Sequence, residues 1–237
     1  MMKYEEKLIL QERCFDEWGN LLPREVLFLF ETLAGHHAEV LGVGFAAMLE
    51  KNLLWVVRNI KYQFCGELVP GAEVVGITWP LPQTKVGFVR EYLICDAAGN
   101  VLIKGTSNWV MIHADTRQLA VAAKIYPEGE YCLEKNFEEK TRRISDVEGK
   151  ETAVICPDAS DIDANGHVNN TRYAEFAHRA LENFGGRIHT FQIDYLREVL
   201  CGEEISLFTA RSGDTVFVKG VSQEEEKIFA CCAVLKS

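Results

Sequence analysis

The feature that most constrains the fold is a repeated order of elements: a strand, a helix and four further strands, twice along the chain. Strand-like segments dominate, because they are rich in β-branched and aromatic residues and are separated by short turns. They are residues 54–62, 73–79, 86–95 and 101–112 in the first half, and 189–196, 204–211, 215–221 and 227–235 in the second. Such spacing predicts two antiparallel meanders.

One helix-like segment precedes each meander. Residues 173–184 carry apolar side chains at the three- and four-residue spacing of an amphipathic helix, and the glycines at 185–186 are expected to end it. In the first half, residues 23–52 are apolar on nearly all sides, which predicts a well-buried helix that starts at Pro23. The Gly-Val-Gly run at 42–44 is expected to break or kink that helix.

Short matches between the halves indicate a duplication. Residues 16–23 (DEWGNLLP) align with 163–170 (DANGHVNN), and 64–71 (FCGELVPG) align with 195–202 (YLREVLCG). One long helix packed on a curved antiparallel sheet is the hot-dog arrangement, and two copies in one chain would reproduce the dimer that single hot-dog units commonly form. We therefore predict an α+β fold, a double hot-dog with two tandem units.

A charged segment separates the two halves. Residues 134–150 are nearly free of large apolar side chains, so we expect them to form a linker. The predicted domains are therefore an N-terminal unit at 1–133, this linker, and a C-terminal unit at 151–237. The sequence leaves the oligomeric state open, a homodimer included, since the duplication already supplies the partner that a single unit needs.

The composition narrows the class of function. The formal net charge of the 237 residues is −10, and since nucleic-acid binders concentrate positive charge, no nucleic-acid partner is expected. No apolar run approaches the roughly 20 residues that span a bilayer, and the N-terminus does not read as a secretory signal. We therefore expect a cytoplasmic protein without membrane insertion. The eight cysteines are scattered and form no CxxC pair, which favours buried free thiols and argues against a structural zinc site.

The stretch DIDANGHVNNTRYAEF is unusually polar for a segment that leads into a helix. Asp163, Asn165 and His167 are two residues apart, so in an extended segment they point to one side. The helix is expected to start at Asn169 or Asn170, both good capping residues. Backbone N–H groups at a helix start can hold the oxyanion that forms when a carbonyl is attacked. Carboxylate, amide and imidazole groups beside them can position and deprotonate water.

A turn followed by a helix cap would explain part of this pattern, since Asn-Gly and Asp-rich stretches are common turns. The first repeat provides an internal comparison. There the positions of Asn165 and His167 hold Trp18 and Asn20, so that copy keeps the run into a helix but not the polar set. A turn alone would not require histidine and asparagine, and this favours a reactive site in the second half.

These residues resemble a hallmark of the acyl-acyl-carrier-protein thioesterases of plants and bacteria, which are double hot-dog proteins. The hallmark D-x-N-x-H-V-N-N with a tyrosine shortly after it matches residues 163–170 and Tyr173. A second hallmark, an aromatic and Arg-rich strand that ends in a catalytic Glu, matches DYLREV at 194–199 and puts Glu198 in that place. Residues 109–119 look like the end of the family's first hot-dog unit.

The resemblance implies hydrolysis of fatty acyl-acyl-carrier-protein thioesters to free fatty acid and holo-carrier protein, which terminates or diverts fatty acid synthesis, without a cofactor. The partner that it implies is an acyl carrier protein bearing a fatty acyl group. The implied catalytic residues are Asp163, Asn165, His167 and Glu198, with oxyanion donors at Val168, Asn169 and Asn170. Many plant members carry a cysteine at the position of Val199, so a thiol mechanism there is excluded in this chain.

Two mechanisms stay open. In one, Glu198 or His167 is the general base on water. Asn165 orients that water, and Asp163 fixes its partners by hydrogen bonds. In the other, Asp163 attacks the thioester and forms an anhydride, which water then opens.

The position of Glu198 in its strand raises a geometric problem. Strict alternation along residues 189–198 puts the aromatic and aliphatic side chains on one face and Asp194 and Glu198 on the other. If the apolar face packs on the helix, Glu198 points away from the site. We therefore predict a bulge or strand end near Arg197 that re-aims it, whereas regular pairing with Glu198 in solvent would remove it from the site.

The acyl chain requires an apolar slot. Small residues in the first helix leave room for one in the N-terminal unit, which is expected not to be catalytic; the slot would be lined by Leu29, Gly42, Gly44 and Met48. Close packing of helix on sheet explains the glycines equally well.

The carrier proteins of this family's reactions are acidic, so a chain of net charge −10 needs a local basic patch to bind one. The candidates are Arg172, Arg179 and Arg187, or Lys140, Arg142 and Arg143 in the linker. Glu175 and Glu182 share the helix face of the first set, which favours a salt-bridged surface as the explanation of those arginines. His36 and His37 lack the HExxH spacing of a zinc hydrolase and are expected on the helix surface.

Three other functions stay open. An acyl coenzyme A thioesterase would share the fold and the chemistry. A hot-dog dehydratase or hydratase is the lyase alternative, and a non-catalytic acyl-binding module is the non-enzyme alternative. The length, branching and unsaturation of the preferred acyl chain are not predictable from one sequence.

Overall fold

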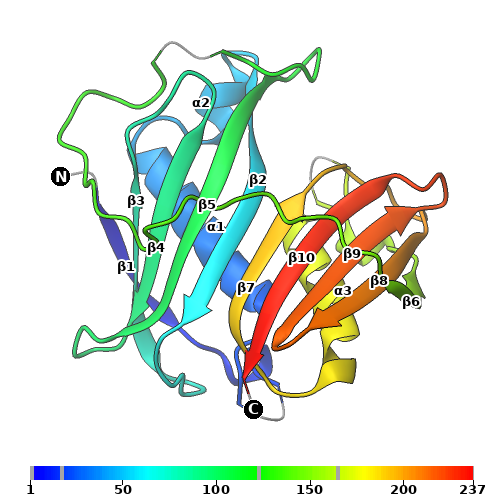
Figure 1. Ribbon diagram of the computed structural model, residues 1–237. Coiled ribbons are helices and arrows are strands. Elements are labelled where there is room, and N and C mark those ends of the chain that lie inside the picture. Colours follow the sequence, from blue (N-terminus) through cyan, green and yellow to red (C-terminus); the bar gives the residue numbers. More distant parts are fainter. Residues whose placement is uncertain (1–2, 17–18, 122–123, 164–165, 237) are drawn as a thin grey trace. The chain divides into compact units, whose positions relative to one another are not determined.

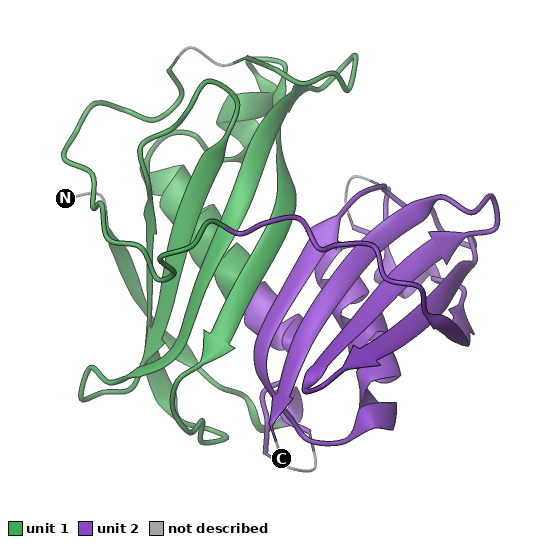
Figure 2. Ribbon diagram, viewed as in Figure 1, with its two compact units in different colours: residues 1–12, 28–140 green, residues 13–27, 141–237 purple. Residues whose placement is uncertain are grey.

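The computed structural model describes residues 3–16, 19–121, 124–163 and 166–236, and the chain forms two compact units (Figure 2). The first unit consists of residues 1–12 and 28–140, and the second of residues 13–27 and 141–237. Within the described ranges, no helix is long and apolar enough to cross a membrane.

The first unit is an antiparallel sheet with one long helix (Figure 1). Its strands are β1 (Tyr4–Ile9), β2 (Leu53–Phe64), β3 (Glu73–Pro80), β4 (Phe88–Cys95) and β5 (Val101–His113), in the spatial order β1-β3-β4-β5-β2. Along the chain, a 3-10 turn (Glu12–Cys14) and then α1 (Pro23–Val40) follow β1, and a short α2 (Phe45–Leu49) leads into β2. Residues 13–27, which include the start of α1, are counted in the second unit.

The second unit has the same connectivity. After β6 (Lys150–Ile155) come a 3-10 turn (Ala159–Asp161), α3 (Asn170–Leu181) and a further 3-10 turn (Glu182–Phe184). Four strands follow: β7 (Arg187–Tyr195), β8 (Ile205–Ser212), β9 (Thr215–Ser222) and β10 (Lys227–Lys236), in the antiparallel order β6-β8-β9-β10-β7. Since β6 to β10 take the places of β1 to β5, the predicted strand, helix and four strands occur twice.

The predicted break in the first helix lies where the Gly-Val-Gly run was expected to cause one. Gly42 has a φ of 68°, a left-handed conformation that side chains disfavour, and it stands between α1 and α2. Gly44 caps α2 and lies against Glu39, since a Cβ at this position would be 1.9 Å from the Glu39 Oε1 atom. Gly42 therefore has a backbone reason to be there, whereas Gly44 has an ordinary φ of −68° and meets only the end of the flexible Glu39 side chain.

Two strand glycines allow α1 to approach the first sheet closely. A Cβ on Gly105 would lie 2.2 Å from the Phe30 ring, and one on Gly76 would lie 2.8 Å from Leu33. Phe30 in turn stacks on Tyr92 of β4 at a centroid distance of 4.3 Å. Aromatic stacking at this distance adds to the burial of apolar area, which is the main force holding helix to sheet.

In the second unit, the amphipathic stripe of α3 packs on the sheet as predicted. Tyr173 and Phe176 are buried, and the Tyr173 ring meets those of Tyr195 and Phe229 at 5.9 and 5.7 Å. The 3-10 turn carries the helical path on to Phe184, and Gly185 with a φ of 63° follows as the cap.

Residues 134–149, which we call the strap, are attached to the sheets rather than free in solvent. In the first unit, Asn136 donates its backbone N–H to Glu91 Oε2 at 3.0 Å and its amide side chain to the carbonyls of Tyr92 and Gly105 at 2.8 Å each. Phe137 lies under the ammonium groups of Lys61 and Lys104. Burial raises the pKa of Glu91, and its bonds to Asn136 and Thr106 oppose that rise.

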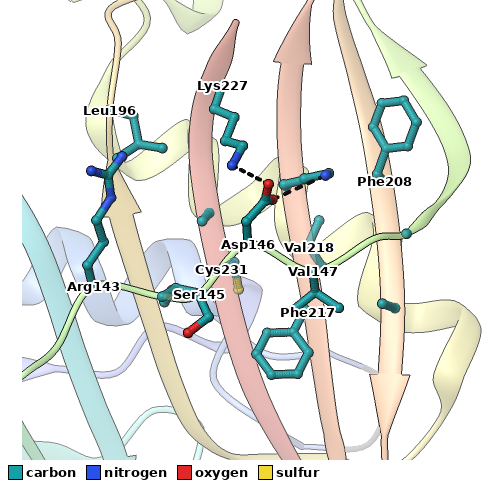
Figure 3. Close-up of a pocket in the computed structure, with 15 residues that line it drawn as sticks. Arg143, Ser145, Asp146, Val147, Leu196, Phe208, Phe217, Val218, Lys227 and Cys231 are labelled. Carbon is teal, nitrogen blue, oxygen red and sulfur yellow. Dashed lines mark hydrogen bonds and ion pairs between the residues drawn. The ribbon is translucent and has the colours of Figure 1, made fainter. Parts of the chain in front are cut away.

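The second half of the strap is held in the same way by the second sheet. Ile144 donates its N–H to Asp194 Oδ2 at 2.7 Å, and the Gln192 side chain donates to the Arg142 carbonyl at 2.8 Å. Asp146 pairs with Lys219 and Lys227 above a cavity of about 340 Å³ (Figure 3). The linker composition therefore reflects a tethered segment, because the backbone N–H groups of Asn136 and Ile144 are each bound by a buried carboxylate.

Replacing Asp194 by alanine is expected to lower the free energy of unfolding by about 1–3 kcal/mol, because the donors from Ile144 and Gln192 lose their acceptor in a buried place. Asp194→Asn keeps an acceptor oxygen and should lose less. The matched control is Asp146→Ala, whose exposed ion pairs should be worth at most about 1 kcal/mol. Urea unfolding of the three variants measures the differences, and equal losses for Asp194→Ala and Asp146→Ala would contradict the tethering role of Asp194.

Candidate active site

The backbone of the polar stretch closes between Asp163 and His167. The Asp163 N–H donates to the His167 carbonyl at 2.9 Å, and the Gly166 N–H donates to the Asp163 carbonyl at 3.1 Å. Gly166 has a φ of 84°, which explains the glycine. The candidate residue Asn165 lies outside the described residues.

The start of α3 is built by Asn169, which is its N-cap. The Asn169 side chain accepts hydrogen bonds from the N–H and the hydroxyl of Thr171, at 2.8 and 2.6 Å. The backbone N–H of Val168 donates to the Val199 carbonyl and that of Asn169 to the Asp161 carbonyl, each at 2.8 Å. These two amides are therefore occupied, and the oxyanion role stays a prediction for Asn170 alone.

Glu198 lies beside His167. The distance between His167 Nε2 and Glu198 Oε2 is 3.4 Å, within ion-pair range, and the two side chains are 29% and 50% exposed. The Val168–Val199 hydrogen bond joins the residue after His167 to the residue after Glu198. The backbone thus brings together two residues that are 31 positions apart in the sequence.

The predicted irregularity near Arg197 is confirmed, and it explains the position of Glu198. β7 ends at Tyr195, and the N–H groups of both Leu196 and Arg197 donate to the Ile228 carbonyl, at 2.9 and 3.1 Å. Two consecutive donors on one acceptor interrupt the alternation of side chains. Because the strand ends here, Glu198 turns toward His167 instead of continuing on the face of Asp194.

The loop after β7 is held by charged pairs and by one buried side chain. Arg197 pairs with Glu203 at 2.5 Å and with Glu226 at 3.1 Å. Val199 is fully buried, as expected for its apolar side chain. Burial raises the pKa of the nearby Tyr173 phenol above its ordinary value.

The first repeat forms the same turn without the histidine. The Asp16 N–H donates to the Asn20 carbonyl at 2.9 Å, the Gly19 N–H donates to the Asp16 carbonyl at 3.1 Å, and Gly19 has a φ of 78°. The Asn20 side chain donates to Asp16 at 2.8 Å, which closes the turn on itself. Trp18 lies outside the described residues. The turn therefore forms without His167, which separates the fold of this motif from its chemistry.

The other predicted positions have surroundings of their own in the two units. Of the residues predicted to line the acyl slot, Met48 is fully buried and Leu29 is half-buried. Gly42 and Gly44 lie at the break between α1 and α2. The acyl slot therefore stays a prediction. Arg179 pairs with Glu175 at 2.7 Å, as the salt-bridged alternative predicted. Arg187 is exposed and lines a groove of about 940 Å³ in the second unit.

The salt-bridged alternative is also correct for Arg172 and Glu175, but sequence reasoning missed the second partner of Arg172, which is Asp161. The Arg172 guanidinium is mostly buried and pairs with Asp161 at 3.0 Å and with Glu175 at 2.7 Å, so it is engaged within the protein rather than presented to a carrier. The signal was present in the sequence, since an acid and a base stand on either side of the polar turn at a helix start.

Two tandem hot-dog units, with a histidine and a glutamate paired at the start of the second helix, define this chain as a double hot-dog protein. The family model of the acyl-ACP thioesterase N-terminal domain matches residues 2–128, and that of the C-terminal domain matches residues 144–236. The chain therefore belongs to the acyl-ACP thioesterase family.

Individual relatives agree with this assignment. An oleoyl-acyl carrier protein thioesterase from Coriandrum sativum is 26% identical to this chain, and the match covers 90% of this chain and 64% of that protein. A palmitoyl-acyl carrier protein thioesterase from Arabidopsis thaliana is 34% identical over 61% of this chain and 39% of that protein. The crystal structure of an acyl-ACP thioesterase from Bacteroides thetaiotaomicron is similar with a TM-score of 0.89 at 25% identity, covering 99% of this chain and 98% of that one. The chain thus spans less than two thirds of the plant relatives.

Proposed function

We propose that this protein hydrolyses fatty acyl-acyl-carrier-protein thioesters, releasing free fatty acid and the holo-carrier protein, and so terminates or diverts fatty acid synthesis. The observation that carries the proposal is the 3.4 Å contact between His167 and Glu198 at the start of α3, in a chain that belongs to the acyl-ACP thioesterase family. Both side chains are partly exposed, so water and a thioester can reach them.

In the mechanism that this geometry favours, Glu198 takes a proton from water while the water oxygen attacks the carbonyl carbon of the thioester. His167, in contact with the Glu198 carboxylate, fixes its orientation and shares the proton. The tetrahedral intermediate then breaks the carbon–sulfur bond, and the leaving carrier thiolate takes up the proton. The half-exposed carboxylate suits this role, since the attacking water must approach it.

Attack by Asp163 with an anhydride intermediate is the alternative. The test is a single turnover with excess protein in water labelled with ¹⁸O, in which label found in the protein is the decisive result. Label in the peptide that contains Asp163 identifies an anhydride opened at the aspartyl carbon. Label confined to the fatty acid is the result expected for the Glu198 route.

A panel of thioesters tests the proposed function. The purified protein is incubated with acyl groups of several lengths, each linked to acyl carrier protein or to coenzyme A, and thiol release and free fatty acid are followed. Hydrolysis with higher kcat/KM on the carrier-protein esters is expected. A preference for coenzyme A esters would make the protein an acyl coenzyme A thioesterase instead. Binding without hydrolysis would leave only the acyl-binding module.

A further inference from the structure

We propose that Arg172, through its ion pair with Asp161, is a positioning residue for the candidate site and holds the turn that carries Asp163 and His167 in register with Glu198. The inference rests on the proposed function, because it concerns the same site. The residues involved lie in the second unit and in its described part.

The Arg172 guanidinium uses all three of its nitrogen atoms. Nε pairs with Asp161 Oδ1 at 3.0 Å, Nη2 donates to the Ser160 carbonyl at 3.0 Å, and Nη1 donates to Glu175 Oε2 at 2.7 Å. The side chains of Arg172 and Asp161 are 16% and 14% exposed, so the pair is well shielded from water. A planar fork with three fixed partners has one orientation, unlike a flexible surface cation.

Asp161 connects this fork to the turn. Its second carboxylate oxygen accepts the Asp158 N–H at 3.0 Å and so closes the capping box of the 3-10 turn. Its carbonyl accepts the Asn169 N–H at 2.8 Å. Arg172 therefore joins the 3-10 turn to the first turn of α3, and both ends of the loop from 162 to 169 are pinned at one place.

The first repeat shows that the fold does not need an ion pair here. With the same alignment that matches Asp16 to Asp163, the positions of Asp161 and Arg172 hold Cys14 and Glu25. These two also touch, since the Cys14 thiol donates to Glu25 Oε2 at 3.2 Å, and burial is the main cause of the raised pKa of Cys14. In the first repeat, whose turn carries Asn20, a contact made by a neutral thiol is thus enough for the turn to form. The ion pair occurs in the second repeat, whose turn carries His167.

This pairing matters because the contact between His167 and Glu198 depends on the position of a short loop. A displacement of about 1 Å in a catalytic group can cost about a hundredfold in rate, even when the substrate still binds. Loss of the Arg172 fork removes one of the ties that hold the start of the loop, while the hydrogen bond from the Asn169 N–H to the Asp161 carbonyl and the buried stripe of α3 remain. The expected effect is therefore on kcat rather than on KM.

The test compares Arg172→Met with Arg24→Met in the full chain. Arg24 also pairs with Glu175, at 3.1 Å, but none of its described contacts reaches the 3-10 turn. Arg24→Met therefore removes one positive charge beside Glu175, as Arg172→Met does, and leaves the 3-10 turn untouched. With the carrier-protein thioester that the wild type hydrolyses fastest, Arg172→Met should lower kcat about 10- to 100-fold with KM within about threefold. Arg24→Met should stay near the wild-type values.

Two further variants separate positioning from simple loss of stability. Arg172→Lys keeps the charge but not the fork, and it should recover only part of kcat. Asp161→Asn should lower kcat as Arg172→Met does, and the double variant should be no worse than either single one, since the two residues act as a unit. All are assayed at a temperature where circular dichroism shows the native state. A folded Arg172→Met protein with wild-type kcat would overturn the proposal.

A spectroscopic readout makes the test independent of turnover. The imidazole ¹⁵N resonances of His167 report its contact with Glu198, and Glu198→Gln gives the reference for its loss. Arg172→Met should move these resonances toward that reference, and Arg24→Met should leave them in place. Unchanged resonances in Arg172→Met would refute the positioning role, whether or not the protein hydrolyses thioesters. A wild-type protein that hydrolyses none of the thioesters would count only against the proposed function.

Discussion

The His167→Gln and Glu198→Gln variants are each expected to lower the rate of thioester hydrolysis by about a hundred- to ten-thousandfold, the range that a positioned base or acid contributes. Both side chains are partly exposed and lie outside the buried core, so the variants should fold. Because the two residues act on one water, the double variant should be little worse than the worse single variant. Steady-state kinetics on one carrier-protein thioester measure all three.

The first repeat supplies the matched control for this prediction. Asn20 occupies in its own turn the place that His167 has in the second, and its side chain bonds only to Asp16 among its described contacts. Asn20→Ala should therefore leave the hydrolysis rate unchanged while it loosens that turn. A His167→Gln or Glu198→Gln protein with wild-type activity would remove the pair from the mechanism.

The protein is expected to lose stability in acid because of His37, by about 3 kcal/mol between neutral pH and pH 4. Burial lowers the pKa of His37 to about 4, and the Arg90 guanidinium, 3.0 Å from its Nδ1, acts in the same direction. The unfolded chain binds a proton at this residue near its ordinary value of about 6.5, whereas the folded chain does not. Stability is thus present above that value and is lost as the pH falls toward 4.

The surroundings of His37 account for the direction of the shift. Its ring stacks on Tyr4 at 5.5 Å, and Arg90, itself buried, also donates to the Thr78 hydroxyl at 3.3 Å. The carboxylate of Glu6 bonds to Tyr4 and His36 instead. Each of these direct partners of His37 is neutral or cationic, so nothing in direct contact favours an imidazolium.

Unfolding by urea at pH 7, 5.5 and 4.5 measures this effect. His37→Gln keeps an acceptor for Arg90 and should flatten the dependence on pH, whereas His36→Gln changes an exposed neighbour and should retain most of it. If the free energy of unfolding of the His37→Gln protein fell with pH as steeply as that of the wild type, groups other than His37 would cause the loss of stability in acid.

The elements of this fold were predictable because each is set by nearby residues. The spacing of apolar side chains after Tyr173 predicted α3, and the glycines at 185–186 predicted its end. The run at 42–44 predicted the break after α1, where Gly42 takes the left-handed conformation. Alternation also predicted an irregularity near Arg197, because a regular strand could not have put Glu198 beside the helix.

Other features could not be predicted because they depend on what an element meets. His36 and His37 were both expected on the helix surface, and for His37 this is wrong. Consecutive residues on a helix are about 100° apart, so His36 stays exposed while His37 turns toward β4 and is buried. The charged composition of the strap predicted a linker but not the buried Glu91 and Asp194 that bind its backbone.

The sequence by itself determined the duplicated order of strands and helices, the start of α3 and the residue types at the polar turn, since periodicity and turn chemistry act over a few neighbouring residues. Only the tertiary structure decided which polar groups meet. The His167–Glu198 contact depends on where β7 leaves its partner strand, and the Asp161–Arg172 pair depends on how the turn folds back on the helix. The first contact is set by long-range backbone pairing, which no local pattern encodes, and the second by the fold of a short segment whose residue types the sequence showed but whose contact it did not.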